Sequence, residues 1–354
     1  MSPSEGITKE LDEKFVELIG KFISDIKNGK LRGSNSTALA TVTLLEQIIT
    51  DSQNATAYEL VGTVRAVCAR LGAALPHAFA AGNVARRLLR AIRDENRAHV
   101  HQSGEGSGAS LQRLVLAAPA RRGTLGAALD LREPIRDHIA ELRSELESST
   151  MSICAQARAH VHGSELVLAA GGGGAGALAE RFLRAAAPAR YHLVLAEGAH
   201  VAQSHAMASR LSAAGVPVTV ISNAAICAVM SRVNKVVISV AAALGGGAAL
   251  AAAGALAAVQ AAHHYSVPVL ALAPLYKLSP MHACDANRIN ELAAPHAALP
   301  YQRCEVGVVH AFAPMYDFVP PEHITLFITN LGGSSPSYMY RMLSELYDPN
   351  DYNI

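Results

Sequence analysis

A glycine-rich segment has the clearest residue pattern that could do chemistry. The sequence GGGGAGA at 171–177 follows an apolar run and precedes a helical pattern. It places Gly171, Gly173 and Gly176 at the G-x-G-x-x-G spacing of dinucleotide-binding loops. Such loops hold a pyrophosphate at the start of the next helix, and Glu197 stands where an acid would bind the ribose. Four consecutive glycines in a chain rich in Ala and Gly also match this spacing by accident, so both interpretations stay open.

The cysteines are candidate nucleophiles, which need an activating base close by. Cys227 lies in AAICAVMS, where a helical pattern predicts a small buried hydrophobic residue. Cys284 and Cys304 occur near His282 and His296, so a Cys–His pair is an alternative there. No acid stands at a position that would support such a pair.

The fifteen histidines do not follow a metal-binding pattern. Their close pairs lack the i, i+4 spacing of helical zinc sites, and the chain has no H-E-x-x-H sequence. The close pairs are His99 with His101, His160 with His162, and His263 with His264. We therefore expect no metal site and no cofactor.

Composition limits the function classes. The chain has 354 residues, 51% of them hydrophobic, so a wholly disordered protein is excluded. Its 30 basic and 29 acidic residues give a net charge of +1, which provides no overall field for nucleic acid or a membrane surface. Five widely spaced cysteines exclude a disulfide framework and a thiolate zinc site. The first residues lack the blocks of a signal peptide, and we expect a cytoplasmic protein.

Apolar periodicity predicts a helical first half. Phe15, Leu18 and Phe22 recur at three- and four-residue steps with charged residues between them, as on a surface helix. Further helices are predicted over 36–52, from about residue 54, over 83–99 and over about 125–160. A loop rich in Gly and Ser is predicted over 102–123.

The second half has a different hydrophobic pattern, in which short apolar runs alternate with helical patterns. Six strands are predicted, in ELVLAA, YHLVLAE, VPVTVIS, KVVISV, VPVLALAP and HITLFITN. Strands alternating with helices indicate a mostly parallel sheet covered on both faces, with ligands at the carboxyl ends of the strands. The predicted organisation is a helical domain over 1–160 and a doubly wound α/β domain over 161–354.

Two segments have competing interpretations. Residues 236–262 contain no charged side chain and are long enough to span a bilayer, but their Ala and Gly content favours a strand, a glycine turn and an Ala-rich helix. Arg86, Arg87, Arg90 and Arg93 are typical of a solvated helix face, and a phosphate or an acidic partner is the alternative.

The C-terminal sequence YDFVPPEHITLFITNLGGSSPSYMYRMLSELYDP is rich in aromatic and apolar residues. Such residues pack in a core or form a large obligate interface. Together with AICAVMSRVNKVVISV and HHYSVPVLALAPLYKLSP, this sequence resembles the regulatory subunits (alpha, beta and delta) of eukaryotic translation initiation factor 2B. LRGSNSTALATVTLLEQII and GNVARRLLRAIRDE are similar to the same family. The resemblance covers nearly the whole chain except about 102–123 and 281–312, and MSRVNK and PPEHITLF favour the beta branch.

The resemblance implies a helical domain joined to a Rossmann-like domain, within a two-fold symmetric decamer. Its partners would be sister alpha, gamma, delta and epsilon subunits, and the complex is the guanine-nucleotide exchange factor for initiation factor 2. The regulatory core senses phosphorylation of the alpha subunit of that factor. Direct contact with nucleic acid or a membrane is not expected.

The resemblance also extends to sugar-phosphate isomerases, which use a cysteine and an aspartate in this fold. By register these positions fall at Gly171 and Ala241, and the Asn-Lys pair of the isomerases falls at Ala251 and Ala252. Glycine and alanine supply neither a nucleophile nor a proton carrier. We therefore expect no catalytic residues. The rival interpretation is an isomerase-like or nucleotide-binding enzyme that uses GGGGAGA, and a third is an alpha or delta sister subunit.

Two residue sets follow from the resemblance. A family pocket for a small molecule near the symmetry axis implies that the corresponding residues line a ligand site or an interface here. These are His162, Ser164, His192, Thr219 and Ile221, with Ser164 replacing an asparagine of the family. The C-terminal motif implies subunit-interface residues, which are Asn330, Gly332, Gly333, Tyr338, Tyr340 and Tyr347.

Overall fold

The computed structural model of the chain describes residues 13–31, 33–52, 57–104, 132–170, 176–199, 201–282, 290–299 and 310–352. Most of the GGGGAGA segment lies outside these residues, as do Cys284 and Cys304. Residues 102–104 of the predicted loop belong to a helix. The rest of that loop, from residue 105 onward, lies outside the described residues.

The chain folds into two compact units. The first comprises residues 1–145 together with 346–354, and the second comprises residues 146–345. The division therefore differs from the boundary predicted after residue 160, and the end of the chain belongs to the helical unit. The chain passes between the units within a continuous helix, where a helical sequence pattern gives no sign of a boundary.

The first unit is built from helices. They are α1 (Glu13–Lys27), α2 (Ser34–Asp51), α3 (Ala57–Ala74), α4 (Phe79–Gly104) and the first part of α6 (Arg132–Ala155). The predicted stripe of α1 is confirmed at Phe15 and Phe22, which are buried together with Ile19. Helices α2 and α3 both pack on α4, whose apolar residues Leu89 and Ile92 are fully buried. Burial of these stripes stabilises helices that would be marginal alone.

The second unit is built around one sheet. Its strands are β1 (Leu166–Ala170), β2 (His192–Ala196), β3 (Val218–Ile221), β4 (Lys235–Leu244), β5 (Ala249–Ala252), β6 (Val269–Leu272), β7 (Leu278–Ser279), β8 (Tyr316–Val319), β9 (Leu326–Thr329) and β10 (Gly332–Ser334). Its helices are α7 (Ala157–His160), α8 (Gly176–Ala186), α9 (Val201–Ala213), α10 (Ile226–Met230), α11 (Ala255–His264) and α13 (Met339–Leu346), the last of which ends at the boundary.

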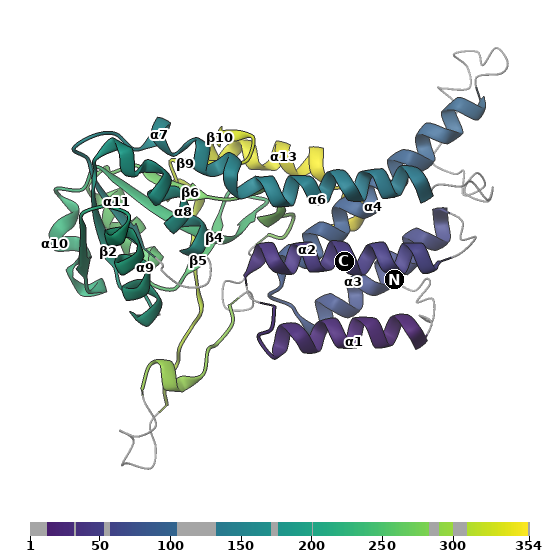
Figure 1. The fold of residues 1–354 in the computed structure, drawn as a ribbon, viewed down its shortest axis with the longest axis horizontal. Helices are drawn as coiled ribbons and strands as arrows, with labels where there is room; N and C mark the ends of the chain where they lie inside the picture. Colours follow the sequence, from purple (N-terminus) through teal and green to yellow (C-terminus); the bar gives the residue numbers. More distant parts are fainter. Residues whose placement is uncertain are drawn as a thin grey trace. The chain divides into compact units, whose positions relative to one another are not determined.

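The strand order is β10-β9-β6-β4-β1-β2-β3, and only β10 pairs antiparallel along this path. All six strands predicted from the sequence are present, and the predicted mostly parallel α/β sheet is confirmed. The order reverses direction between β1 and β4. Right-handed crossovers therefore place α8 and α9 on one face of the sheet and α11 on the other (Figure 1).

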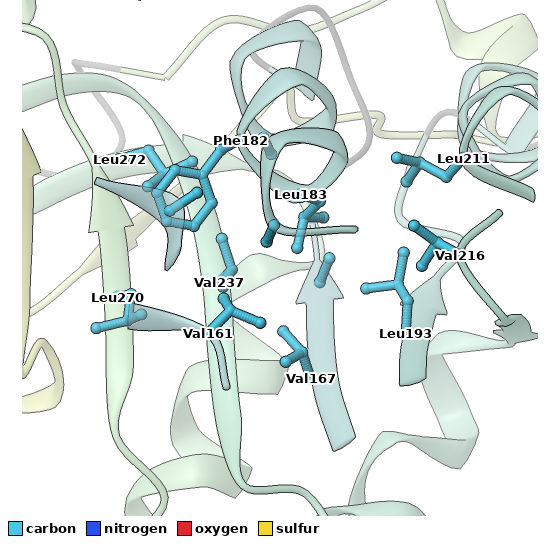
Figure 2. Packing of buried hydrophobic residues seen from close by; sticks show 14 of the residues in the cluster. Val161, Val167, Phe182, Leu183, Leu193, Leu211, Val216, Val237, Leu270 and Leu272 are labelled. Carbon is cyan, nitrogen blue, oxygen red and sulfur yellow. The ribbon is translucent and has the colours of Figure 1, made fainter. Parts of the chain in front are cut away.

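The core of this unit lies between the sheet and helices α8 and α9. Figure 2 shows Phe182 and Leu183 of α8 above Val167 and Val237 of the central strands. Leu211 of α9 packs over the neighbouring side of the same layer. These side chains are buried, and such a continuous apolar layer is the dominant stabilising feature of a doubly wound sheet.

The uncharged segment 236–262 differs in part from its prediction. Strand β4 continues to Leu244, and the glycine turn leads to a further strand, β5, before α11 begins at Ala255. The Ala-rich sequence concealed β5, because a run of alanines shows neither a two-residue nor a helical period. Within the part of the chain that the structure describes, no helix is long and apolar enough to cross a membrane.

Candidate functional site

The carboxyl ends of the parallel strands were the first candidate for chemistry. Ala241, Ala251 and Ala252, three of the four positions predicted to correspond to catalytic residues of the isomerases, lie in the buried strands β4 and β5 and present only methyl groups. The fourth, Gly171, lies outside the described residues. Asp317 of β8 accepts hydrogen bonds from the backbone N–H groups of Gly254 and Leu256, at 2.8 and 2.9 Å. The chain's own carboxylate therefore caps the N-terminus of α11.

Other polar residues at this edge are bound to one another. The Glu197 carboxylate lies 3.0 Å from His205 Nε2, and the Ser204 hydroxyl donates to the Glu197 carbonyl at 2.6 Å. The Asn223 side chain accepts a hydrogen bond from the Gly198 amide at 3.0 Å. Cys227 is exposed, whereas a buried position was predicted, because Ile226 and Met230 provide the buried face of the short helix α10.

The glycine turn after β4 holds the chain's own C-terminal segment. Gly247 has φ +79°, and a Cβ there would lie 2.4 Å from the Pro336 carbonyl oxygen. A Cβ on Gly245 would lie 3.0 Å from the Leu343 side chain. The absence of side chains in this turn therefore allows the segment before and within α13 to pack closely against it. The turn serves packing.

The five predicted pocket residues lie around strands β1, β2 and β3. The structure brings His192 and Thr219 into contact, with 2.9 Å between His192 Nε2 and the Thr219 hydroxyl. The amide of Ser164 donates to the Arg190 carbonyl at 3.2 Å, and Ser164 has φ +62°. His162, Ser164, His192 and Thr219 are exposed, and Ile221 at the far end of β3 is half-buried. The arrangement forms an open polar surface next to the exposed edge strand β3.

An ion pair organises the loop before β1. The Glu165 carboxylate lies 2.8 Å from Lys235 Nζ and accepts a hydrogen bond from the His162 amide at 2.9 Å. Burial alone would raise the pKa of Glu165, but the His162 amide and Lys235 lower it overall. Burial together with the charges of Lys235 and His162 lowers the pKa of His160. These contacts fix the loop that carries His162 and Ser164.

A second surface is formed by β10 and α13. Tyr338 and Tyr340 are 41% and 66% exposed, and Leu331, which sequence reasoning missed, is 76% exposed. The Arg341 guanidinium lies 5.7 Å from the centre of the Tyr338 ring. Gly333 lies on β10, and a Cβ there would lie 2.9 Å from the Leu326 side chain. Exposed large apolar side chains near a sheet edge are typical of interaction surfaces.

Two predicted interface residues have internal roles. Tyr347, predicted as an interface residue, is fully buried within its own chain, so its ring offers no surface to a partner. Burial raises the pKa of its phenol above the ordinary value. The Asn330 side chain accepts a hydrogen bond from the Leu275 amide at 2.9 Å, which ties the β9–β10 turn to the segment after β6.

The arginines of α4 do not form the solvated face that their spacing suggested. Arg86 is 6% exposed, and Arg93 binds Asp348 and Asp351 near the end of the chain. The acidic partner is therefore part of the chain itself. The sequence carried a signal for this cluster, since Arg86, Arg93 and Arg97 share a helix face, but nothing indicated which acids they bind.

Sequence reasoning also missed a buried lysine. Lys277 is 3% exposed, and its Nζ donates to the Val240 carbonyl at 2.7 Å. Burial lowers the pKa of Lys277 to about 8. Ser279, in the neighbouring strand β7, is fully buried, and its hydroxyl has no hydrogen-bond partner among the described residues. Those residues also contain no group of three or more His, Cys, Asp or Glu side chains placed to bind a metal ion.

Comparison with known proteins gives consistent results. The model of the initiation factor 2 subunit family matches residues 30–336. Translation initiation factor eIF2B subunit beta of Schizosaccharomyces pombe is 34% identical over 94% of this chain and 96% of its own length. A crystal structure of eIF2B beta from Chaetomium thermophilum superposes with a TM-score of 0.74 at 25% identity, covering 98% of this chain and 99% of that one.

A further solved structure is an assembly. A chain from the tetrameric eIF2B-beta2-delta2 complex of C. thermophilum superposes with a TM-score of 0.70 at 26% identity. The match covers 95% of this chain and 96% of that one.

Proposed function

Because the chain belongs to the initiation factor 2 subunit family, we propose that it is a beta-type, non-catalytic regulatory subunit of the guanine-nucleotide exchange factor for translation initiation factor 2. The observation that carries this proposal is the near full-length similarity to a protein named as the beta subunit, at 34% identity. Superposition on the C. thermophilum beta structure over 98% of the chain supports it.

The chemistry of the strand ends supports a role without catalysis. Three isomerase-like positions carry alanine, and the N-terminus of α11 is capped by Asp317. Alanine methyl groups cannot transfer protons or attack a substrate. We therefore infer that the sheet serves as a scaffold. An isomerase-like or nucleotide-dependent activity would require other residues to supply the reactive groups.

Assembly with a delta-type subunit is the first task we assign to the chain. Support comes from the similarity to a chain of a beta2-delta2 tetramer. The surface formed by Leu331, Tyr338 and Tyr340 has the exposed aromatic residues that protein interfaces favour. Gly332 of β10, where a Cβ would meet nothing within 4 Å, allows close approach of a partner's backbone at this sheet edge, whereas Gly333 makes room for the chain's own Leu326.

The surface that carries His192 and Thr219 is the second proposed contact. Its side chains are exposed, and the neighbouring edge strand β3 has no strand partner on one side among the residues that the structure describes. We infer that this surface, with His162, Ser164 and Ile221, meets another subunit or a small molecule bound between subunits. Serine offers fewer hydrogen bonds than the asparagine expected at position 164, which would weaken a ligand contact.

The remaining parts of the proposal rest on the family resemblance. We propose a place in a decamer with alpha, gamma, delta and epsilon subunits, contact with initiation factor 2, and response to phosphorylation of its alpha subunit. We also propose that the chain acts in the cytoplasm, as part of the integrated stress response.

Native mass spectrometry of the tagged chain, purified from its own cells, tests the proposal. We expect a hetero-oligomer that contains the sister subunits. Recovery of the chain alone, or of an enzyme activity on sugar phosphates in the purified chain, would contradict it.

A pair of matched variants tests the proposed contact surface. Tyr338→Ser combined with Tyr340→Ser is expected to reduce recovery of a co-expressed delta-type subunit at least tenfold, because interface aromatics each contribute more than about 1 kcal/mol. Tyr265→Ser removes a similarly exposed ring, 44% exposed, and is the control. Equal recovery with both variants would remove this surface from the interface.

A further inference from the structure

The C-terminal turn, residues 347–351, binds to the helical unit through an arginine cluster. The cluster consists of Arg65 on α3 and of Arg86, Arg93 and Arg97 on α4. All these residues belong to the first unit, although the chain reaches the turn from the second. Asp351 is fully buried and Asp348 is 8% exposed. Charged side chains are rarely buried to this extent unless they are paired.

Both carboxylates of the turn are paired with arginines. Arg65 donates to Asp351 Oδ1 from Nε and Nη2, at 3.1 and 2.8 Å. Arg93 donates to both oxygens of the same carboxylate, with Nη2 2.8 Å from Oδ1 and Nη1 bonded to Oδ2. Asp348 Oδ2 lies 3.4 Å from both Arg93 Nη1 and Arg97 Nη2. Such forked contacts between guanidinium and carboxylate are among the strongest hydrogen bonds in proteins.

The cluster also binds the backbone of the turn. Arg65 Nη2 donates to the Asn350 carbonyl at 2.8 Å, and Arg86 Nε donates to the Asp351 carbonyl at 3.1 Å. Asp348 Oδ1 accepts from the Asn350 amide at 2.9 Å and so fixes the single helical turn. An inorganic anion lacks these carbonyl groups. The contacts are therefore specific for a peptide in this conformation.

Tyr347 provides an apolar anchor beside the charged contacts. Its ring is fully buried, and it directly precedes the acidic turn. A buried aromatic next to charge-assisted hydrogen bonds is the usual composition of an interaction hot spot. The turn thus has the parts of a short peptide ligand.

We propose that the helical unit contains a binding site for a doubly acidic peptide turn of the form Tyr-Asp-Pro-x-Asp, and that the chain's own C-terminal turn occupies it. The site carries four guanidinium groups against two carboxylates. Arg65 and Arg97 keep 41% and 61% of their side-chain surface exposed. A competing peptide can therefore contact the exposed guanidinium groups of Arg65 and Arg97 while the C-terminal turn is still bound.

The test uses the full chain and a fluorescent peptide with the sequence of residues 345–354. Asp351→Asn removes the charge that two arginines bind. We expect hydrogen exchange of the amides of the C-terminal turn to accelerate at least about 100-fold while the helices stay protected. The peptide should bind this variant and not the wild-type chain, whose site is occupied. Adding Arg93→Met to Asp351→Asn should abolish peptide binding.

Glu345→Gln is the matched control, because this exposed carboxylate pairs with Arg341 and does not touch the cluster. It should leave both hydrogen exchange and peptide binding at wild-type values. Unchanged exchange in Asp351→Asn, or failure of the peptide to bind after the turn is released, would overturn the proposal. Loss of protection throughout the helices would also overturn it, because the turn would then be part of the core and not a bound ligand.

Discussion

The two units bury charge in opposite ways. In the helical unit, Asp351 is fully buried and Arg65 and Arg93 surround its carboxylate. In the sheet unit, Lys277 is 3% exposed and its ammonium binds one backbone carbonyl, that of Val240. None of the ion pairs among the described residues involves Lys277. One unit therefore holds a compensated network and the other an isolated charge.

This difference predicts opposite responses to substitution. Removing one member of a buried ion-pair network leaves the others without compensation and costs stability. Removing a buried charge that has no charged partner eliminates a desolvation cost and leaves no opposite charge unpaired. Burial of a charge therefore does not by itself determine whether its removal raises or lowers the free energy of unfolding. The partners of the charge determine it.

The largest expected effect is that of Arg93→Met. Arg93 is the arginine that binds both Asp348 and Asp351, so its loss leaves two buried carboxylates with fewer partners. The free energy of unfolding should fall by about 3–5 kcal/mol, measured by urea denaturation.

Arg90→Met is its control on the same helix. Arg90 is half-buried and pairs at 3.2 Å with the exposed Asp94, so its loss should cost less than that of Arg93, about 1 kcal/mol. Similar losses for the two variants would mean that the buried network adds nothing beyond a surface pair.

The next effect is a pH dependence caused by Lys277. Its pKa is about 8 in the folded chain, against 10.5 for the unperturbed side chain. Below pH 8 both the folded and the unfolded chain carry the proton, so the folded state bears the full cost of the buried charge. Between pH 8 and 10.5 the unfolded chain binds more protons, so stability rises with pH. The gain should be about 3 kcal/mol.

Lys277→Met isolates this contribution from other groups that titrate in the same range. At pH 7 the variant should be more stable than the wild type by about 2 kcal/mol, because methionine fills a similar volume without a charge. The difference between the two chains should shrink as the pH rises from 8 to 10.5. A constant difference, or a less stable variant at pH 7, would mean that Lys277 has a compensating partner.

Only part of the fold is predictable from the sequence. The six predicted strands were found because their apolar runs are short and bounded by turn residues, as in ELVLAA and HITLFITN. Strand β5 was missed because alanine has no pattern, and its second partner, β8, lies far along the chain. The division into units was missed because the chain crosses it inside a helix.

The local sequence carries only part of the signal for the candidate site. The aromatic C-terminal sequence pointed to Tyr338, Tyr340 and Tyr347 alike, and the burial of Tyr347, which sets it apart from the other two, depends on the helical unit. The partner of Arg93 lies 258 positions away, so spacing along the helix indicated a cluster and not its ligand. The burial of Lys277 follows from the strands around it, which no local pattern reveals.

The smallest expected effect concerns Ser279. Its hydroxyl is buried without a hydrogen-bond partner among the residues that the structure describes, so it bears a desolvation cost without compensation. Ser279→Ala should raise the free energy of unfolding by about 1 kcal/mol. Ser204→Ala is the matched control, because Ser204 is equally buried but donates to the Glu197 carbonyl at 2.6 Å. Its loss should cost about 1 kcal/mol. Urea denaturation of both variants measures the difference, and a destabilised Ser279→Ala chain would show that this hydroxyl has a partner, so that the two buried hydroxyls of the sheet unit would no longer differ.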